Sequence, residues 1–329
     1  MELIDFESHF YSDSLFDVLC SRDEYPYCTD RNKFYYSDDF AVPVSDTLFL
    51  HTDEFIEARI AEMDACGVST QVLGISQGLE ELQGLQSIEC ARATHDLIYK
   101  VSNNYPDRFI CFGTFPVGDI DASIAEMERC KNELGFKGWM TFSNYRYSYI
   151  DQPQYRPLLA AAERLKLPVY IHPTAPVIDR LGGLGMAMAG GAMGFTIDTA
   201  ITAARLIFQG AFDDYPDLQL ILGHLGEGLP YTLDRMDKRS SVQKASKSRN
   251  EHLPSYYFRK NIWVTTSGIF SNPTFECAKT VLGIDRILFG SDYPYEHLTD
   301  AVNYVEELPI SGSDRAKLYS ENAQRLFLL

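Results

Sequence analysis

The chain has 329 residues, of which 45% are hydrophobic and 23% charged, a composition typical of a globular protein with a sizeable core. Its formal net charge of −17 argues against nucleic acids and anionic membrane surfaces as partners. The seven cysteines form no C-x-x-C pair, no signal peptide is recognisable, and no stretch stays apolar for the length of a membrane span. We therefore expect reduced thiols, no membrane contact and a cytoplasmic location.

Short apolar runs alternate with amphipathic segments along nearly the whole chain. The predicted strands cover residues 3–6, 68–75, 109–115, 137–142, 168–172, 218–223, 262–266 and 286–290. The predicted helices cover residues 53–66, 89–104, 120–134, 155–165, 197–208, a segment from about 227, 273–281, 299–307 and 314–327. The alternation predicts parallel β/α units, and eight of them in a chain of this length predict a single closed (β/α)₈ barrel spanning residues 1–329.

An open, doubly wound sheet is the alternative architecture. Such a sheet usually carries a glycine-rich phosphate-binding turn after its first strand, and no such turn follows residues 3–6. The glycines within residues 181–195 follow the fifth predicted strand and lack the spacing of either common nucleotide-binding motif. We interpret this glycine-rich segment as a loop and favour the barrel.

A long segment without clear periodicity, residues 11–50, separates the first predicted strand from the first predicted helix. It is rich in Tyr, Phe, Asp and Ser. Loops of this length inside a compact domain are uncommon and are often functional. We expect either a surface excursion packed by its own aromatic side chains or an insertion that covers the active site.

Polar side chains stand at the ends of four predicted strands. Glu7 and His9 follow the first strand two positions apart, and side chains at that spacing on an extended segment point to the same side. His172, His224 and Asp292 end the fifth, sixth and eighth strands. In a (β/α)₈ barrel these ends meet at one face, where catalytic groups sit. Nitrogen and oxygen donors gathered in this way suit a borderline divalent metal ion.

The other histidines have weaker claims to a role. His51, His95 and His252 lie in helical or polar segments, and we expect them to be exposed or hydrogen-bonded. His297 lies close behind Asp292 and is an outside candidate only.

These residues resemble the amidohydrolase superfamily of metal-dependent barrels over nearly the whole chain, and more narrowly its decarboxylase branch. The segments that carry the resemblance are 7–10 (ESHF), 151–157 (DQPQYRP), 171–173 (IHP), 222–231 (LGHLGEGLPY) and 291–296 (SDYPYE). Glu7 replaces the first histidine of the common His-x-His opening, as in the hydroxybenzoate decarboxylases. Lys137 stands at the beginning of the fourth strand, so the metal-bridging lysine at that strand's end is missing. The resemblance therefore implies one divalent metal ion, Zn²⁺ or Mn²⁺, per chain.

The resemblance also implies roles for individual residues. The metal ligands would be Glu7, His9, His172 and Asp292, with open positions for substrate or water. His224 is similar to the family's catalytic histidine, and Glu227 could orient it. The alternative for Glu227 is a carboxylate placed at a helix start, where the helix dipole favours it.

Two arginines are candidates for holding an anionic substrate. Arg235 lies eleven residues after His224, where the similar decarboxylases carry an arginine near the substrate. Arg59 lies in the first predicted helix. The alternative for both residues is a surface ion pair.

The resemblance implies non-oxidative decarboxylation of an ortho-hydroxy aromatic acid, with Asp292 as proton donor to the ring carbon. Metal-dependent hydrolysis of an ester, lactone or amide is an alternative because the same ligands would serve it. A non-catalytic metal-binding protein is a third hypothesis, although it leaves His224 and Glu227 without a role. The expected partners are a small anionic aromatic substrate and other copies of the chain, as a dimer or tetramer.

Overall fold

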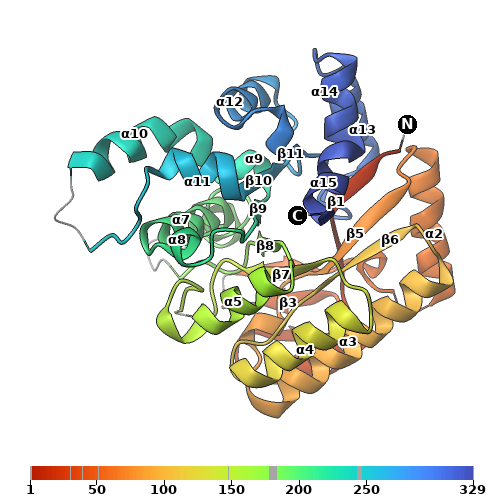
Figure 1. The fold of residues 1–329 in the computed structure, drawn as a ribbon. Helices are drawn as coiled ribbons and strands as arrows, with labels where there is room; N and C mark the ends of the chain where they lie inside the picture. The colour runs from red at the N-terminus through yellow and green to blue at the C-terminus, as the bar shows by residue number, and fades with distance from the viewer. Residues whose placement is uncertain are drawn as a thin grey trace.

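The computed structural model describes residues 2–29, 31–38, 40–50, 52–146, 148–177, 184–242 and 247–328, and its core is a barrel of eight parallel strands. Their order is β1 (Ile4–Phe10), β5 (Thr70–Ile75), β6 (Phe109–Gly113), β7 (Gly138–Phe142), β8 (Val169–His172), β9 (Leu220–Leu222), β10 (Ile262–Thr265) and β11 (Ile287–Leu288). Backbone hydrogen bonds from Phe6 to Phe289 and from Asp292 to Glu7 join the first strand to the segment of the last. These bonds close the ring and confirm the predicted (β/α)₈ fold (Figure 1).

Helices surround the strands in Figure 1. The longer ones are α2 (Asp53–Ala65), α3 (Gly84–Asn104), α4 (Ile120–Asn132), α5 (Arg156–Arg164), α7 (Gly194–Phe208), α10 (Leu229–Val242), α11 (Pro254–Asn261), α12 (Asn272–Leu282) and α13 (Leu298–Glu307). Side chains start two of them: Thr52 and Asp119 accept the backbone N–H of Phe55 and Ala122. The last predicted helix is broken into α14 (Gly312–Ala316), a π-helical turn and α15 (Asn322–Leu328). No described helix has the length and apolarity needed to cross a membrane.

The barrel interior is filled by side chains, one or more from each strand. Each strand contributes to one buried cluster, which includes Phe6, Val72, Phe112, Met140, Tyr170, Ile221, Trp263 and Leu288. A second, larger cluster lies between the strands and the surrounding helices. The packed interior leaves space for chemistry only at the ends of the strands.

The segment 11–50 has its own secondary structure, and the expectation of a stretch without it was wrong. It contains α1 (Asp13–Cys20), whose start is capped by the Ser12 hydroxyl, and a three-stranded antiparallel sheet. The strands are β2 (Tyr27–Thr29), β3 (Lys33–Tyr35) and β4 (Ala41–Pro43). Strands of three residues are too short for the alternation that identifies a strand in a sequence.

Candidate active site

The first strand is longer than predicted and contains two of the expected metal ligands. β1 runs on through Glu7 and His9, which are both fully buried. The pairing of β1 with β5 shifts by one residue between Asp5 and Ser8, which is a β-bulge. Phe6 can therefore fill the barrel interior while Glu7, the next residue, reaches Thr265 on β10.

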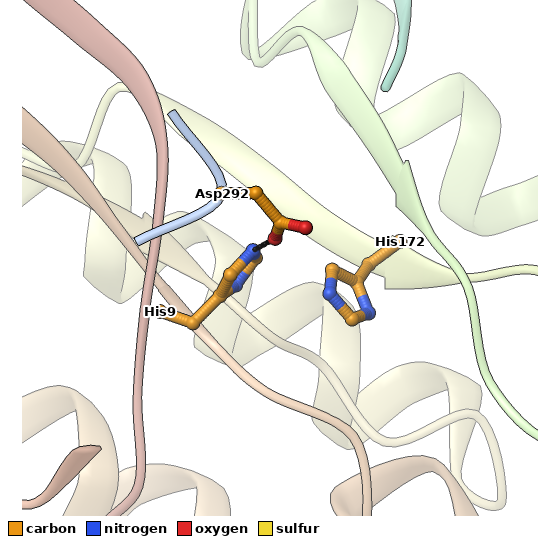
Figure 2. A group of neighbouring side chains, drawn as sticks. All are labelled: His9, His172 and Asp292. Carbon is orange, nitrogen blue, oxygen red and sulfur yellow. Dashed lines mark ion pairs between the residues drawn. The ribbon is translucent and has the colours of Figure 1, made fainter. Parts of the chain in front are cut away.

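Three side chains from well-separated parts of the sequence converge at this end of the barrel. The donor atoms of His9, His172 and Asp292 all lie within 4.8 Å of one another. Figure 2 shows the three side chains pointing toward a common space, and His9 Nε2 is 3.2 Å from Asp292 Oδ1. Glu7 lies outside this mutual group, but its Oε1 is 3.8 Å from His9 Nε2. Separate strands of the barrel thus bring together donor side chains that the sequence places at strand ends.

The hydrogen bonding of these residues fits a bound cation. Glu7 Oε1 and both ring nitrogens of His9 are buried without a hydrogen-bond partner among the described residues. His172 Nδ1 is 2.7 Å from the Pro173 carbonyl, to which it donates its proton, so His172 Nε2 is left as a free lone pair. Buried polar atoms without partners are costly, and a divalent ion bound by nitrogen and oxygen donors would satisfy them.

The charges of this group depend on one another. Burial lowers the pKa of His9, but the carboxylates of Asp292 and Glu7 outweigh it and raise the pKa to about 9. Burial, reinforced by the neighbouring His9, lowers the pKa of His172 to about 3, so His172 is neutral. Burial would raise the pKa of Asp292, yet the adjacent His224 and His9 hold it below the ordinary value. Asp292 and His172 are therefore already in the ionised and neutral forms that bind metals, whereas His9 would have to lose its proton when a metal ion binds.

His224 and Glu227 form a tight pair beside the three converging side chains. His224 Nδ1 is 2.7 Å from Glu227 Oε1, and His224 Nε2 is 3.7 Å from Asp292 Oδ2. Burial lowers the pKa of His224, but Glu227 and Asp292 outweigh it and raise the pKa well above the ordinary value. Glu227 is 3% exposed and accepts the Nδ1 proton, which leaves the Nε2–H of His224 directed at Asp292.

The backbone around His224 is strained. His224, Leu225 and Glu227 have φ between 51° and 55°, and Asp292 has φ of 70°. Side-chain-bearing residues rarely adopt these angles, and such strain tends to collect at functional sites. A Cβ atom at Gly268 would lie 2.7 Å from His224 Cδ2, so this position requires glycine. The surrounding structure thus holds His224 in a position that the local chain disfavours.

The two arginines do not face this group of residues. Arg59 is 2% exposed, donates from Nη2 to the His9 backbone carbonyl at 2.6 Å, and lies over the Tyr293 ring. It therefore supports the backbone behind His9. Arg235 is exposed on α10 and lines a separate cavity together with Met236 and Arg239. Substrate binding by either arginine stays a prediction.

A cavity of about 210 Å³ opens onto the site and is lined by His172, His224 and Asp292. Larger cavities lie elsewhere, but this one is lined by two of the three converging donors, His172 and Asp292. An apolar cavity of about 150 Å³ can hold benzene, so this space suits one substituted aromatic ring. Val42 of β4 lines it, which places the segment 11–50 at the same end of the barrel. Gln77 and Tyr295 also line it. Tyr295 lies within the segment 291–296 that carries the family resemblance, whereas no pattern in the sequence singles out Gln77.

A second group of potential ligands, His95, Glu126 and Cys130, is hydrogen-bonded internally. His95 Nδ1 lies 2.8 Å from Glu126 Oε1, and its Nε2 accepts the backbone N–H of Thr114 at 3.1 Å. Arg129 also binds both oxygens of Glu126. Both ring nitrogens of His95 therefore have hydrogen-bond partners, which confirms the expectation that this histidine is hydrogen-bonded.

A buried network ties the segment 11–50 to the end of β8. The Tyr36 hydroxyl lies 3.0 Å from Thr174 Oγ1, which donates to Glu80 Oε1 at 2.5 Å. The backbone N–H of Gly78 binds the other oxygen of Glu80 at 2.6 Å. Burial and the nearby Glu81 raise the pKa of Glu80 to about 8. At neutral pH this carboxyl group is therefore mostly protonated.

Replacing Glu80 with Gln should make stability less dependent on pH. Because the folded-state pKa of about 8 exceeds the ordinary value of 4.5, the folded chain binds this proton more tightly than the unfolded chain. The free energy of unfolding of the wild type should therefore decrease as the pH rises between these two values. In Glu80→Gln this decrease should be smaller by roughly 2–4 kcal/mol. Urea unfolding at pH 5 and pH 8.5 measures the difference.

The exposed Glu89 provides the matched control for that measurement. Glu89→Gln should leave the difference in unfolding free energy between the two pH values close to that of the wild type. An equal loss of stability in wild type and Glu80→Gln across this range would show that Glu80 is not buried in a protonated state.

Comparisons with known proteins agree with this geometry. A family model described as amidohydrolase matches residues 51–329. The chain is 36% identical over 286 residues to γ-resorcylate decarboxylase of Rhizobium sp. (strain MTP-10005), covering 83% of this chain and 87% of that protein. It superposes on 2,6-dihydroxybenzoate decarboxylase from Rhizobium with a TM-score of 0.83 at 31% identity, covering 100% of this chain and 99% of that one. It superposes on 5-carboxyvanillate decarboxylase from Sphingomonas paucimobilis with a TM-score of 0.88 at 30% identity, with 100% and 99% covered. The chain therefore belongs to the amidohydrolase family, within the group of its members that are metal-dependent decarboxylases.

Proposed function

We propose that this chain is a carboxy-lyase that catalyses metal-dependent, non-oxidative decarboxylation of an ortho-hydroxy aromatic carboxylic acid. The observation that carries the proposal is the convergence of His9, His172 and Asp292 beside the His224–Glu227 pair in a cavity sized for one ring. One similar structure is a 2,6-dihydroxybenzoate decarboxylase complexed with 2,6-dihydroxybenzoate, with a TM-score of 0.85. Another, from Polaromonas sp. JS666, holds manganese and the inhibitor 2-nitroresorcinol.

The metal site would be formed by Glu7, His9, His172 and Asp292. A bound divalent ion would supply charge stabilisation and orientation for the carboxylate and neighbouring phenolate of the substrate. Manganese is found in several of the similar decarboxylases, and the mixed nitrogen and oxygen donors would also accept Zn²⁺.

The chemistry requires a proton at the ring carbon before the carboxylate leaves. Direct loss of CO₂ would leave an aryl anion of very high energy. Protonation of the carbon that bears the carboxylate avoids this, because the ortho-hydroxyl makes that carbon basic enough to accept a proton. The C–C bond then breaks, its electron pair restores the aromatic ring, and CO₂ departs.

We propose a route for that proton through His224 and Asp292. Asp292 is ionised at rest and must take up a proton before it can deliver one. The neighbouring His224, whose pKa is raised, would supply it from Nε2, which lies 3.7 Å from Asp292 Oδ2. We assign Asp292 as the group that delivers the proton to carbon, and His224 as the group that restores it. Glu227 positions the imidazole through its Nδ1–H. General acid catalysis of this kind typically contributes about 10²–10⁴-fold.

Hydrolysis of an ester, lactone or amide is the alternative function, since the same ligands could activate water. The decarboxylases among the similar proteins and the space for a single ring favour decarboxylation. We further propose a homodimer or homotetramer and a single domain whose segment 11–50 covers the active site, as Val42 indicates. All seven cysteines are free thiols, which supports our proposal of a cytoplasmic location.

The direct test is to incubate Mn²⁺-loaded protein with a panel of hydroxybenzoates and simple esters. We expect CO₂ release from an ortho-hydroxybenzoate and no acid release from the esters. Removal of the metal with a chelator should abolish turnover, and added Mn²⁺ should restore it. Ester hydrolysis without any CO₂ would instead support the hydrolase alternative.

A further inference from the structure

Gln77 is a neutral hydrogen-bonding side chain in the wall of the active-site cavity. It follows β5, is 2% exposed, and lines the same cavity as His172 and Asp292. The assigned metal ligands and the proton route do not use it. A buried amide placed in a cavity wall needs partners for both its oxygen and its nitrogen.

Neighbouring residues fix the orientation of this amide. The Ser76 hydroxyl donates to Gln77 Oε1 at 2.6 Å and also lies 2.6 Å from the Tyr295 hydroxyl. Ser76 has one hydroxyl proton and uses it on Gln77, so Tyr295 must be the donor to Ser76. The chain of donors therefore runs from Tyr295 through Ser76 to Gln77 Oε1. No described residue accepts a hydrogen bond from Gln77 Nε2, which leaves the amide N–H groups available to a ligand in the cavity.

The other described residues that line the cavity limit which ligand group can accept a hydrogen bond from the Gln77 amide. Val42, Met186 and Phe195 are apolar, and no described lysine or arginine lines the cavity. Glu296 and Asp292 are its acidic residues. A second carboxylate on the substrate would face these acids without a described cation to offset the repulsion. An uncharged oxygen is the acceptor that suits a neutral amide donor in this wall.

We propose that Gln77 determines specificity by donating a hydrogen bond from Nε2 to an uncharged oxygen substituent on the substrate ring, in addition to the carboxylate and ortho-hydroxyl. This inference rests on the proposed function and narrows it to aromatic monocarboxylates that carry a second hydroxyl or comparable oxygen. Ser76 and Tyr295 are the positioning residues that present the amide. A site built to hydrogen-bond a substrate hydroxyl discriminates strongly against the analogue that lacks it, because its own donor is then left unpaired.

The test compares two ligands that differ by one hydroxyl group, 2-nitroresorcinol and 2-nitrophenol. Calorimetric titration of Mn²⁺-loaded wild-type protein should show about tenfold or tighter binding of 2-nitroresorcinol, the gain expected from one hydrogen bond to a buried donor. Gln77→Met keeps the side-chain length and removes the donor, so the ratio of the two affinities should fall close to one. Ser76→Ala should reduce the ratio partly, since the amide is then free to rotate.

Gln83→Met is the matched control, because Gln83 is exposed and does not line the cavity. It should leave both affinities unchanged, and metal analysis should show that Gln77→Met retains its manganese. An unchanged affinity ratio in Gln77→Met, or an equal weakening of both ligands, would overturn the proposal. If the ratio shifts as expected but no hydroxybenzoate releases CO₂, the recognition role of Gln77 stands and the proposed reaction is wrong.

Discussion

His172→Ala should lower the metal content to a small fraction of its wild-type value. The four proposed ligands form one site, so the wild type should hold about one divalent ion per chain. His172 is buried, and its Nδ1–H is already bound to the Pro173 carbonyl, so its free Nε2 has no substitute in the described site. Decarboxylation should fall with the metal. Elemental analysis of the purified variant measures the first effect, and CO₂ release measures the second.

His224→Asn provides the contrast, because His224 is bound to Glu227 and lies beside the proposed ligands instead of among them. It should retain most of the metal and still lose turnover. Two metal ions per wild-type chain, or full activity in the metal-free protein, would rule out the assigned site.

Asp292→Asn should reduce decarboxylation by about 10²–10⁴-fold, the usual contribution of a general acid. The amide keeps a neutral oxygen of nearly the same shape, so part of the metal should remain, but it has no ionisable proton to deliver. In D₂O the wild-type enzyme should place one deuterium on the carbon that lost CO₂. Mass spectrometry of the product measures this incorporation.

If Asp292→Asn kept both its metal and near-normal turnover, Asp292 would not be the proton donor. The proton would then have to come directly from His224, whose Nε2 is 3.7 Å from Asp292 Oδ2. His224→Asn would in that case be the more damaging of the two substitutions.

The sequence predicts the barrel because the physical signals of its parts are strong. Each buried strand is a short apolar run and most are followed by a helix with an apolar face, which is the pattern of parallel β/α units. The missed elements have weak signals. The strands of the segment 11–50 are three residues long, and α11 (Pro254–Asn261) is a helix of only eight residues in a polar stretch. The end of β1 was missed because Glu7 and His9 are polar, although both are buried.

The sequence also predicts which donors converge, because strand ends must meet at one face of a barrel. The sequence cannot predict the direction in which a long cationic side chain points. Arg59 could have faced solvent, substrate or backbone, and tertiary packing directs it to the His9 carbonyl. Gln77 was missed for a different reason, since a neutral amide carries no charge or spacing pattern that identifies a function. Its importance depends on Ser76 and Tyr295, which approach it only in the folded chain.

The closure of the ring by its first and last strands has a consequence for how the enzyme matures. The Ser291 hydroxyl binds Asp5, 286 positions earlier, and the adjacent residues Glu7, His9 and Asp292 belong to the proposed ligand set. A ribosome must therefore release almost the entire chain before these donors can meet. A metal ion held by these donors would bind the completed barrel and would stabilise it by mass action, by about 2.7 kcal/mol when free metal is a hundredfold above its dissociation constant. Metal supply would thus affect the stability of the folded enzyme as well as its activity.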